Sequence, residues 1–174
     1  MHDFASPSPW FVRHAPCVAA GARLLDVACG SGRHARFFAW RGVQVVAVDR
    51  DAEALQSLSG IDGIAVECRD LEAQVWPYAP DTFDAVVVCN YLWRPTFGAL
   101  LAMLRPGGVL LYETFMDGNE RYGKPSRPDF LLRSNELIVR THQACRIVEF
   151  EEGDETHASG EIIAVKQKIV AIKR

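Results

Sequence analysis

Apolar residues along the chain gather into short runs that alternate with stretches of helical spacing. The strand-sized runs occupy residues 24–29, 43–49, 64–68, 83–89 and 109–115. Nearly continuous apolar runs are typical of strands buried on both faces, and strands that alternate with helices pair in parallel through right-handed crossovers. The pattern therefore predicts an α/β fold, with a doubly wound sheet and helices on both of its faces.

The last part of the chain breaks this alternation. After a predicted helix near residues 134–140, two strand-like segments at 146–150 and 161–172 are joined by the polar stretch 151–160, with no helix between them. Consecutive strands without a crossover helix form an antiparallel hairpin. We therefore expect a seven-stranded, mostly parallel sheet that ends in a C-terminal antiparallel hairpin.

Two segments lie outside the regular pattern. Residues 1–22 are proline-rich, with one aromatic helical turn around Trp10 and Phe11, and predict an N-terminal cap segment. Residues 117–128 have no periodicity and are long for a simple connection, which predicts an acceptor-side binding loop or, alternatively, a surface excursion. The 174 residues correspond to about one typical domain, so we expect a single domain over residues 1–174.

Composition narrows the class of protein. A hydrophobic content of 49% with 24% charged residues is typical of a globular domain, and the net charge of −3 gives no attraction to nucleic acid, which is not expected as a partner. The five cysteines form no C-x-x-C pair, so neither a disulfide framework nor a metal site is expected. The apolar runs are shorter than the roughly 18 residues of a membrane helix, and the N-terminus lacks the pattern of a signal peptide. These features predict a cytoplasmic protein without membrane association.

Small residues occupy the point where the first strand turns into the first helix, within residues 26–32. Gly30 and Gly32 let the backbone approach a ligand closely, and a helix N-terminus offers free N–H groups. Asp49 ends the second strand, and in a parallel sheet that position lies beside the turn. A carboxylate there can accept both hydroxyls of a ribose, so the pair predicts a ligand that contains adenosine.

Two adenosine-containing cofactors are compatible with this turn, because residues 30–35 also satisfy the G-x-G-x-x-A fingerprint of NAD-binding proteins. Asp26, just before the turn, would repel a pyrophosphate but attract the ammonium of a methionyl group, directly or through water. Asp26 therefore favours S-adenosylmethionine. An NAD-dependent oxidoreductase and a non-catalytic S-adenosylmethionine-binding protein stay open as alternatives.

With these motifs, and with the helix end and tight turn at residues 104–109, the chain resembles a class I S-adenosylmethionine-dependent methyltransferase over roughly residues 9–173. The matching motifs, in the order expected for this family, lie at residues 24–32, 45–49, 68–71, 83–90 and 105–108. The loop at 117–128, with residues 113–115 before it and 128–132 after it, resembles the small bacterial methyltransferases grouped with tellurite-resistance proteins. The resemblance implies a reversed seventh strand between the fifth and sixth.

The resemblance also implies which residues hold the cofactor S-adenosylmethionine. The first strand and the turn after it would hold the methionyl part, and the acid after the second strand would hold the ribose. The third motif would contact the adenine. The end of the fourth strand would line the wall nearest the sulfonium. The residues implied in this way are Asp26, Ala28, Cys29, Gly30, Ser31, Gly32, Asp49, Arg50, Asp70, Leu71, Cys89 and Asn90.

Methyl transfer from a sulfonium is an in-line displacement that needs a general base only when the nucleophile arrives protonated. The sequence therefore predicts no particular catalytic residue, and His34 is expected at the cofactor rim or on the surface. Tyr91 and Trp93 would wall the acceptor pocket, or else pack on the core as helix-capping aromatics. Arg121 and Tyr122, in a loop with further basic residues, suit an anionic acceptor. Because nearly all residues after position 23 are needed for the sheet, we expect a small-molecule acceptor.

Overall fold

The computed structural model describes residues 6–73 and 75–174, so the first five residues of the predicted cap segment lie outside the described part. All seven strands join one sheet in the order β3-β2-β1-β4-β5-β7-β6. The strands are β1 (Arg23–Val27), β2 (Gln44–Asp49), β3 (Ile64–Cys68), β4 (Phe83–Cys89), β5 (Leu104–Phe115), β6 (Cys145–Thr156) and β7 (Ile162–Lys173). The helices are α1 (Pro9–His14), α2 (Arg33–Trp40), α3 (Ala52–Gln56), α4 (Phe97–Ala102) and α5 (Glu136–Thr141), with 3₁₀ turns η1 (Ala15–Cys17), η2 (Arg94–Thr96), η3 (Asn119–Arg121) and η4 (Pro128–Phe130).

The sheet has the predicted topology. Strands β1 to β5 pair in parallel, whereas β7 runs antiparallel to both β5 and β6 and lies between them. The doubly wound fold and its single reversed strand are therefore confirmed, because an apolar run followed by a helix requires a crossover and an apolar run without one requires a hairpin.

Two strand boundaries differ from the prediction. Strand β6 continues to Thr156, through most of the predicted polar connection at 151–160, because it is an edge strand whose polar side chains face solvent and whose Glu151 pairs in register with Lys168 of β7. Strand β5 begins at Leu104, inside the predicted turn, where a register shift against β4 accommodates the glycines. Hydropathy alone does not reveal either extension, because neither added segment is apolar.

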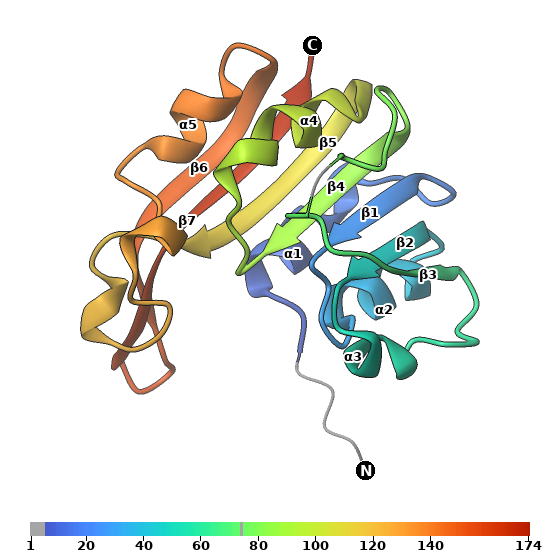
Figure 1. Cartoon of the computed structure of the whole chain (residues 1–174). Coiled ribbons are helices and arrows are strands. Elements are labelled where there is room, and N and C mark those ends of the chain that lie inside the picture. The colour runs from blue at the N-terminus through green and yellow to red at the C-terminus, as the bar shows by residue number, and fades with distance from the viewer. Residues whose placement is uncertain (1–5, 74) are drawn as a thin grey trace.

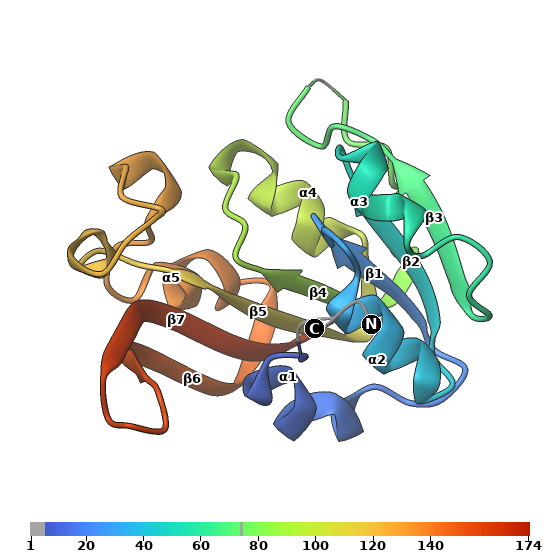
Figure 2. The ribbon, with the colours of Figure 1, turned by 90° about the horizontal axis from the view of Figure 1, so that it is seen from below.

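Helices cover both faces of the sheet, with α1, α2 and α3 on one side and α4 and α5 on the other (Figures 1 and 2). Leu24 and Leu25 show how the sequence builds this arrangement. They are neighbours in β1 and both fully buried, yet Leu24 packs with Phe38 of α2, whereas Leu25 belongs to the opposite cluster with Leu100 of α4. Successive side chains of a strand point to opposite faces, so a continuous apolar run fills two cores.

Other structural features bear on the class of protein. No helix in the described ranges is long and apolar enough to span a membrane. Within residues 6–73 and 75–174, no group of three or more His, Cys, Asp or Glu side chains is placed to hold a metal ion. All five cysteines are free thiols.

Candidate functional site

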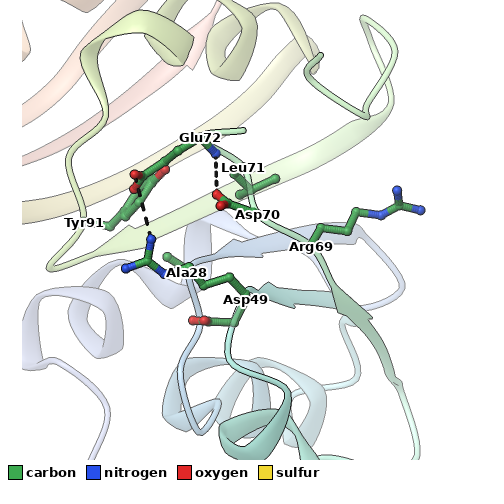
Figure 3. A pocket seen from close by; sticks show the side chains of 8 residues that line it. Ala28, Asp49, Arg69, Asp70, Leu71, Glu72 and Tyr91 are labelled. Carbon is green, nitrogen blue, oxygen red and sulfur yellow. Dashed lines mark hydrogen bonds and ion pairs between the residues drawn. The ribbon is translucent and has the colours of Figure 1, made fainter. Parts of the chain in front are cut away.

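Two adjacent cavities lie at the carboxyl ends of β1, β2 and β4, and they share Ala28. The first cavity, of about 210 Å³, is lined by Ala28, Asp49, Arg50, Arg69, Asp70, Leu71, Glu72 and Tyr91 (Figure 3). The second cavity, of about 310 Å³, is lined by Asp26, Ala28, Cys29, Gly30, Ser31, Arg33, His34, Cys89 and Asn90. Of the twelve residues expected to hold a cofactor, the structure brings all but Gly32 to one of these cavities.

The glycine turn has a conformation that ordinary residues rarely adopt. Ala28, Gly30 and Gly32 have φ angles of 52°, 54° and 76°. A Cβ atom on Gly32 would lie 2.4 Å from Cδ1 of the buried Leu58, whereas a Cβ on Gly30 would meet no atom within 4 Å. Gly32 therefore allows the turn to pack on the segment after α3, which explains why it lines neither cavity. Gly30 leaves open space beside the second cavity.

Asp49 connects this turn to the end of β2. One of its carboxylate oxygens accepts the Gly30 N–H at 2.7 Å, and the other accepts the Asp51 N–H at 2.9 Å. Asp51 in turn caps α3, which holds the chain after β2 in place. Each Asp49 oxygen keeps a lone pair, so the carboxylate can still accept hydrogen bonds from a ligand in the first cavity.

The wall of the first cavity opposite Asp49 comes from the segment after β3 and from Tyr91 after β4 (Figure 3). Asp70 is exposed and accepts the Glu72 N–H at 2.9 Å, and Leu71 between them is buried. Burial and the Glu72 carboxylate raise the pKa of Tyr91, so its hydroxyl stays protonated at neutral pH. Tyr91, expected at an acceptor pocket, thus lies in the same cavity as Asp49 and Asp70.

The second cavity contains a buried acid and a cation. Asp26 is 1% exposed, burial raises its pKa to about 7, and among the described residues its Oδ2 has no hydrogen-bond partner. Arg33 donates from Nη2 to the Cys89 Sγ at 3.2 Å. Burial and the carboxylate of Glu113 raise the pKa of Cys89 to about 11, so this thiol remains neutral. The polar groups at this cavity can therefore bind a ligand, but the thiol is not an activated nucleophile.

His34 lines the second cavity, but its role is structural. It is only 3% exposed, so the expectation that it might lie on the surface is wrong. Its Nε2 accepts the Ser8 N–H at 3.1 Å, and its ring contacts Phe11 edge-on. Burial and the neighbouring Arg33 lower the pKa of His34 to about 3, so the ring is neutral and ties the N-terminal segment to α2.

The other residues expected on the acceptor side lie away from both cavities. Trp93 is half-buried just before η2, and its carbonyl accepts the Thr96 N–H. Arg121 and Tyr122 are exposed, with the Arg121 guanidinium 5.6 Å from the centre of the Tyr122 ring. Their loop follows β5 on the side of α5 and β7, far from α3 (Figures 1 and 2). The structure therefore does not bring these three residues to the cofactor-side cavities.

Arg94 holds the end of this loop. Its guanidinium donates to the carbonyls of Asp129 and Leu131 at 2.7 and 2.6 Å and pairs with Glu136 at 2.8 Å. The base of the loop is closed by a bridge between Met116 and Leu132. The C-terminal end of the loop is thus anchored on the segment that follows β4, and its two ends are joined to each other.

Sequence reasoning missed three residues that line the cavities, Arg33, Arg69 and Glu72. Each is adjacent to a predicted contact, since Arg33 follows Gly32 and the other two flank the segment Asp70 and Leu71. Their position next to a motif was therefore the only feature of the sequence that could have predicted that these residues line the cavities. Residue type did not help, because Arg and Glu are common on any surface.

Comparisons with known proteins agree on one family. Residues 24–108 match the family model described as a methyltransferase domain. The chain is 32% identical over 114 residues to a ubiquinone biosynthesis O-methyltransferase of Burkholderia orbicola, covering 60% of this chain and 48% of that protein. It is 31% identical over 106 residues to a malonyl-[acyl-carrier protein] O-methyltransferase of Pectobacterium atrosepticum, covering 58% of this chain and 41% of that protein. The chain thus spans less than half the length of these two curated relatives.

Solved structures share the fold at low sequence identity. TehB from Haemophilus influenzae superposes with a TM-score of 0.80 at 19% identity, covering 99% of this chain and 64% of that one. An S-adenosylmethionine-dependent methyltransferase from Methanosarcina mazei gives a TM-score of 0.73 at 17% identity, covering 97% of this chain and 99% of that one. Together with the turn between β1 and α2, these findings show a methyltransferase domain over residues 24–108 within the fold of the S-adenosylmethionine-dependent methyltransferases, which implies S-adenosylmethionine as the cofactor.

Proposed function

We propose that this protein transfers the methyl group of S-adenosylmethionine to a small acceptor by in-line displacement. The observation that carries the proposal is the pair of cavities that meet at Ala28. One presents the carboxylates of Asp49 and Asp70, and the other presents the glycine turn and Asp26. An elongated ligand with a nucleoside at one end and an amino acid at the other matches this division.

The residues present fit the cofactor in three respects. Asp49 would accept hydrogen bonds from the ribose hydroxyls, and Asp70 with the Leu71 backbone would meet the adenine edge. The buried Asp26 has an oxygen without a partner in the described chain, as expected of a group that receives an ammonium directly or through water. The open space at Gly30 lets the backbone approach the methionyl part. When bound, the cofactor supplies an electrophilic methyl group on a sulfonium.

We propose an acceptor that is already ionised or soft when it reaches the site. The neutral His34 uses its Nε2 for Ser8, and the raised pKa of Tyr91 keeps that hydroxyl protonated, so neither is suited to remove a proton at neutral pH. An ionised oxygen or a soft nucleophile needs no base, only alignment with the methyl group at about 3 to 3.5 Å. The names of the two curated relatives, both O-methyltransferases, support an oxygen acceptor.

Isothermal titration with S-adenosylhomocysteine tests the cofactor assignment. Asp49→Ala should weaken binding by about 1–3 kcal/mol, because a charge-assisted hydrogen bond to the ribose is lost. Asp49→Asn, which retains one acceptor oxygen, should lose less. Asp62→Ala removes an exposed acid away from both cavities and serves as the matched control.

Two results would contradict the proposal. Unchanged affinity in the folded Asp49→Ala variant would exclude the ribose assignment, and tight binding of NAD without binding of S-adenosylhomocysteine would exclude the cofactor. Incubation with a labelled methyl donor and a panel of oxyanions, phenolates, thiols and small amines then identifies the acceptor.

A further inference from the structure

A cavity of about 500 Å³ lies between η2 and α5, on the side of the sheet that α4 and α5 cover (Figure 1). We call it the arginine cavity, and it is lined by Arg94, Arg133, Ser134, Glu136, Val139 and Arg140. It shares none of these residues with the cavities at Asp26 and Asp49. It is therefore separate from the cofactor side, and arginines make up half of its lining.

Glu136 is the carboxylate of this cavity, and its acceptor positions are all used. Its Oε1 accepts Arg94 Nε at 2.8 Å and Arg140 Nε at 2.6 Å, and its Oε2 accepts Arg94 Nη2 at 2.8 Å and the Arg133 N–H at 2.9 Å. Four hydrogen bonds occupy the lone pairs of one carboxylate. Although burial alone would raise the pKa of Glu136, these hydrogen bonds lower it to about 2. The acid is thus ionised at neutral pH and has no acceptor left for a third guanidinium.

The three guanidinium groups are used unequally. Arg94 donates to two backbone carbonyls as well as to Glu136, so most of its donors are occupied. Arg140 donates from Nε, and its guanidinium lies 5.4 Å from the centre of the Phe97 ring, which holds it in place. Arg133 is exposed, and its guanidinium forms no hydrogen bond or ion pair with any residue that the structure describes. Since a guanidinium has five N–H donors, Arg133 and Arg140 both have donors left for a ligand.

The lining of the cavity carries an excess of positive charge. Three guanidinium groups against one carboxylate leave two positive charges. Two acids beside the cavity already have partners, because Asp129 pairs with Arg127 at 3.2 Å and Glu152 accepts the Ser134 hydroxyl at 2.7 Å. A phosphate group carries a charge of about −1.5 to −2 at pH 7 and three strong acceptor oxygens, and guanidinium groups donate to such oxygens in pairs. A phosphate therefore matches both the charge and the unused donors.

We infer that the arginine cavity binds a phosphate group, either free or on a small organic molecule, through donors of Arg133 and Arg140. Val139 is 64% exposed at the same cavity and offers an apolar contact to an organic part. Because Arg94 also anchors the end of the loop after β5, the bound phosphate lies beside that anchor. This site is distinct from the proposed methyl transfer and does not depend on it.

Isothermal titration of the full chain with inorganic phosphate, in a chloride buffer of constant ionic strength, tests the site. Arg133→Met should weaken phosphate binding by about 3- to 10-fold, because a charged donor pair is lost, and Arg133→Lys should weaken it less. Arg140→Met should also weaken it. Arg146→Met, at an exposed position of β6, removes the same charge elsewhere and is the matched control, which should leave phosphate binding unchanged.

A second titration separates the two sources of the phosphate group. Phenyl phosphate should bind more tightly than inorganic phosphate if the natural ligand is an organic phosphate that uses the contact at Val139. Equal affinities would identify free phosphate as the ligand. In both cases Arg133→Met should weaken the binding of both probes.

Three outcomes would overturn the inference. The first is an absence of saturable phosphate binding by the unmutated chain. The second is an unchanged phosphate affinity in Arg133→Met, or a loss equal to that in Arg146→Met, since net charge alone would then explain binding. The third is a parallel loss of S-adenosylhomocysteine binding in Arg133→Met, because the phosphate would then occupy the cofactor side. Failure of the unmutated chain to bind S-adenosylhomocysteine would overturn the proposed function and leave the phosphate titrations to be judged separately.

Discussion

The carboxyl edge of the sheet has one half at β1 and β2 and another at β5 and β7 (Figure 1), and acidic side chains in the two halves differ in their partners. On the side of β1 and β2, Asp26 and Arg33 lie at one cavity without forming an ion pair, and the Asp49 carboxylate receives only backbone N–H groups. On the side of β5 and β7, Glu113 pairs with Lys166 at 2.6 Å and is also bonded by the Ser8 hydroxyl. Since buried polar groups in folded proteins are normally satisfied internally, the buried Asp26, which has no ion pair, supports the proposal that the ligand binds on the side of β1 and β2, whereas the paired Glu113 has a structural role.

The paired half holds the N-terminal segment on the sheet. Glu113 is 3% exposed, and although burial alone would raise its pKa, the Lys166 ammonium and the Ser8 hydroxyl lower it below its usual value. Glu113 is therefore ionised at neutral pH, and its partners supply hydrogen bonds rather than an open coordination position. This explains why a buried carboxylate close to Cys89 is not a free base for the reaction.

The largest effect should come from breaking the paired half. Lys166→Met leaves the buried Glu113 without its counter-ion and should lower the free energy of unfolding by about 3–5 kcal/mol, measured by urea denaturation. Adding Glu113→Gln should recover much of this loss. Lys124→Met, at an exposed position in the loop after η3, is the control and should have little effect. A loss of less than about 1 kcal/mol for Lys166→Met would mean that the pair is not structural.

A smaller effect should separate the two glycines of the turn. Gly32→Ala adds left-handed backbone strain and a contact with the buried Leu58, and should lower the free energy of unfolding by about 2–4 kcal/mol. Gly30→Ala should cost only the strain, about 1–2 kcal/mol, but should weaken S-adenosylhomocysteine binding because its methyl group occupies the open space at the cavity. Equal stability losses in the two variants, or undiminished ligand binding in Gly30→Ala, would contradict the distinction.

The smallest effect concerns pH on the unpaired half. Because burial raises the pKa of Asp26 to about 7, this group holds a proton below that pH, and an incoming ammonium favours the ionised form. Binding of S-adenosylhomocysteine should therefore release a proton below pH 7, and its affinity should rise with pH by at most about tenfold per unit and level off above pH 7. Isothermal titration with S-adenosylhomocysteine at a series of buffer pH values from about 5.5 to 8, on both sides of the Asp26 pKa, measures this dependence.

Asp26→Asn separates this contribution from others. The affinity of this variant for S-adenosylhomocysteine should be nearly independent of pH. The affinity of the unmutated chain for 5′-methylthioadenosine, which lacks the amino-acid group, should also be nearly independent of pH. The same raised pKa also lowers folding stability as pH increases from the ordinary range of a carboxyl toward 7, since the folded state binds the proton more tightly than the unfolded state. A steep affinity profile that persists in Asp26→Asn would assign the proton to another group.

The close approach of the residues at the ends of β1 and β2 could be predicted, because it depends on local pattern and on strand direction. The glycine turn after β1 and the acid at the end of β2 must meet, since parallel neighbouring strands bring their carboxyl ends to one edge. The acceptor side could not be predicted in the same way. Tyr91 lines the first cavity, and Arg121 lies beside Tyr122 on an exposed loop. Neither position can be predicted from the type of residue or from its spacing along the chain.

By itself, the sequence determined the order of strands and helices along the chain, the C-terminal antiparallel hairpin, the turn at Gly30 and the acid at Asp49, because backbone propensity and hydrophobic period act locally along the chain. Only the tertiary structure decided which charges are neutralised. Glu113 and Asp26 are both buried acids at strand ends, but Lys166 comes from an adjacent strand to pair with the first, whereas no cation of the described chain reaches the second. Whether two charged side chains from different strands or helices form an ion pair depends on the length and direction of each side chain in three dimensions. The pattern of residues along the chain does not contain this information.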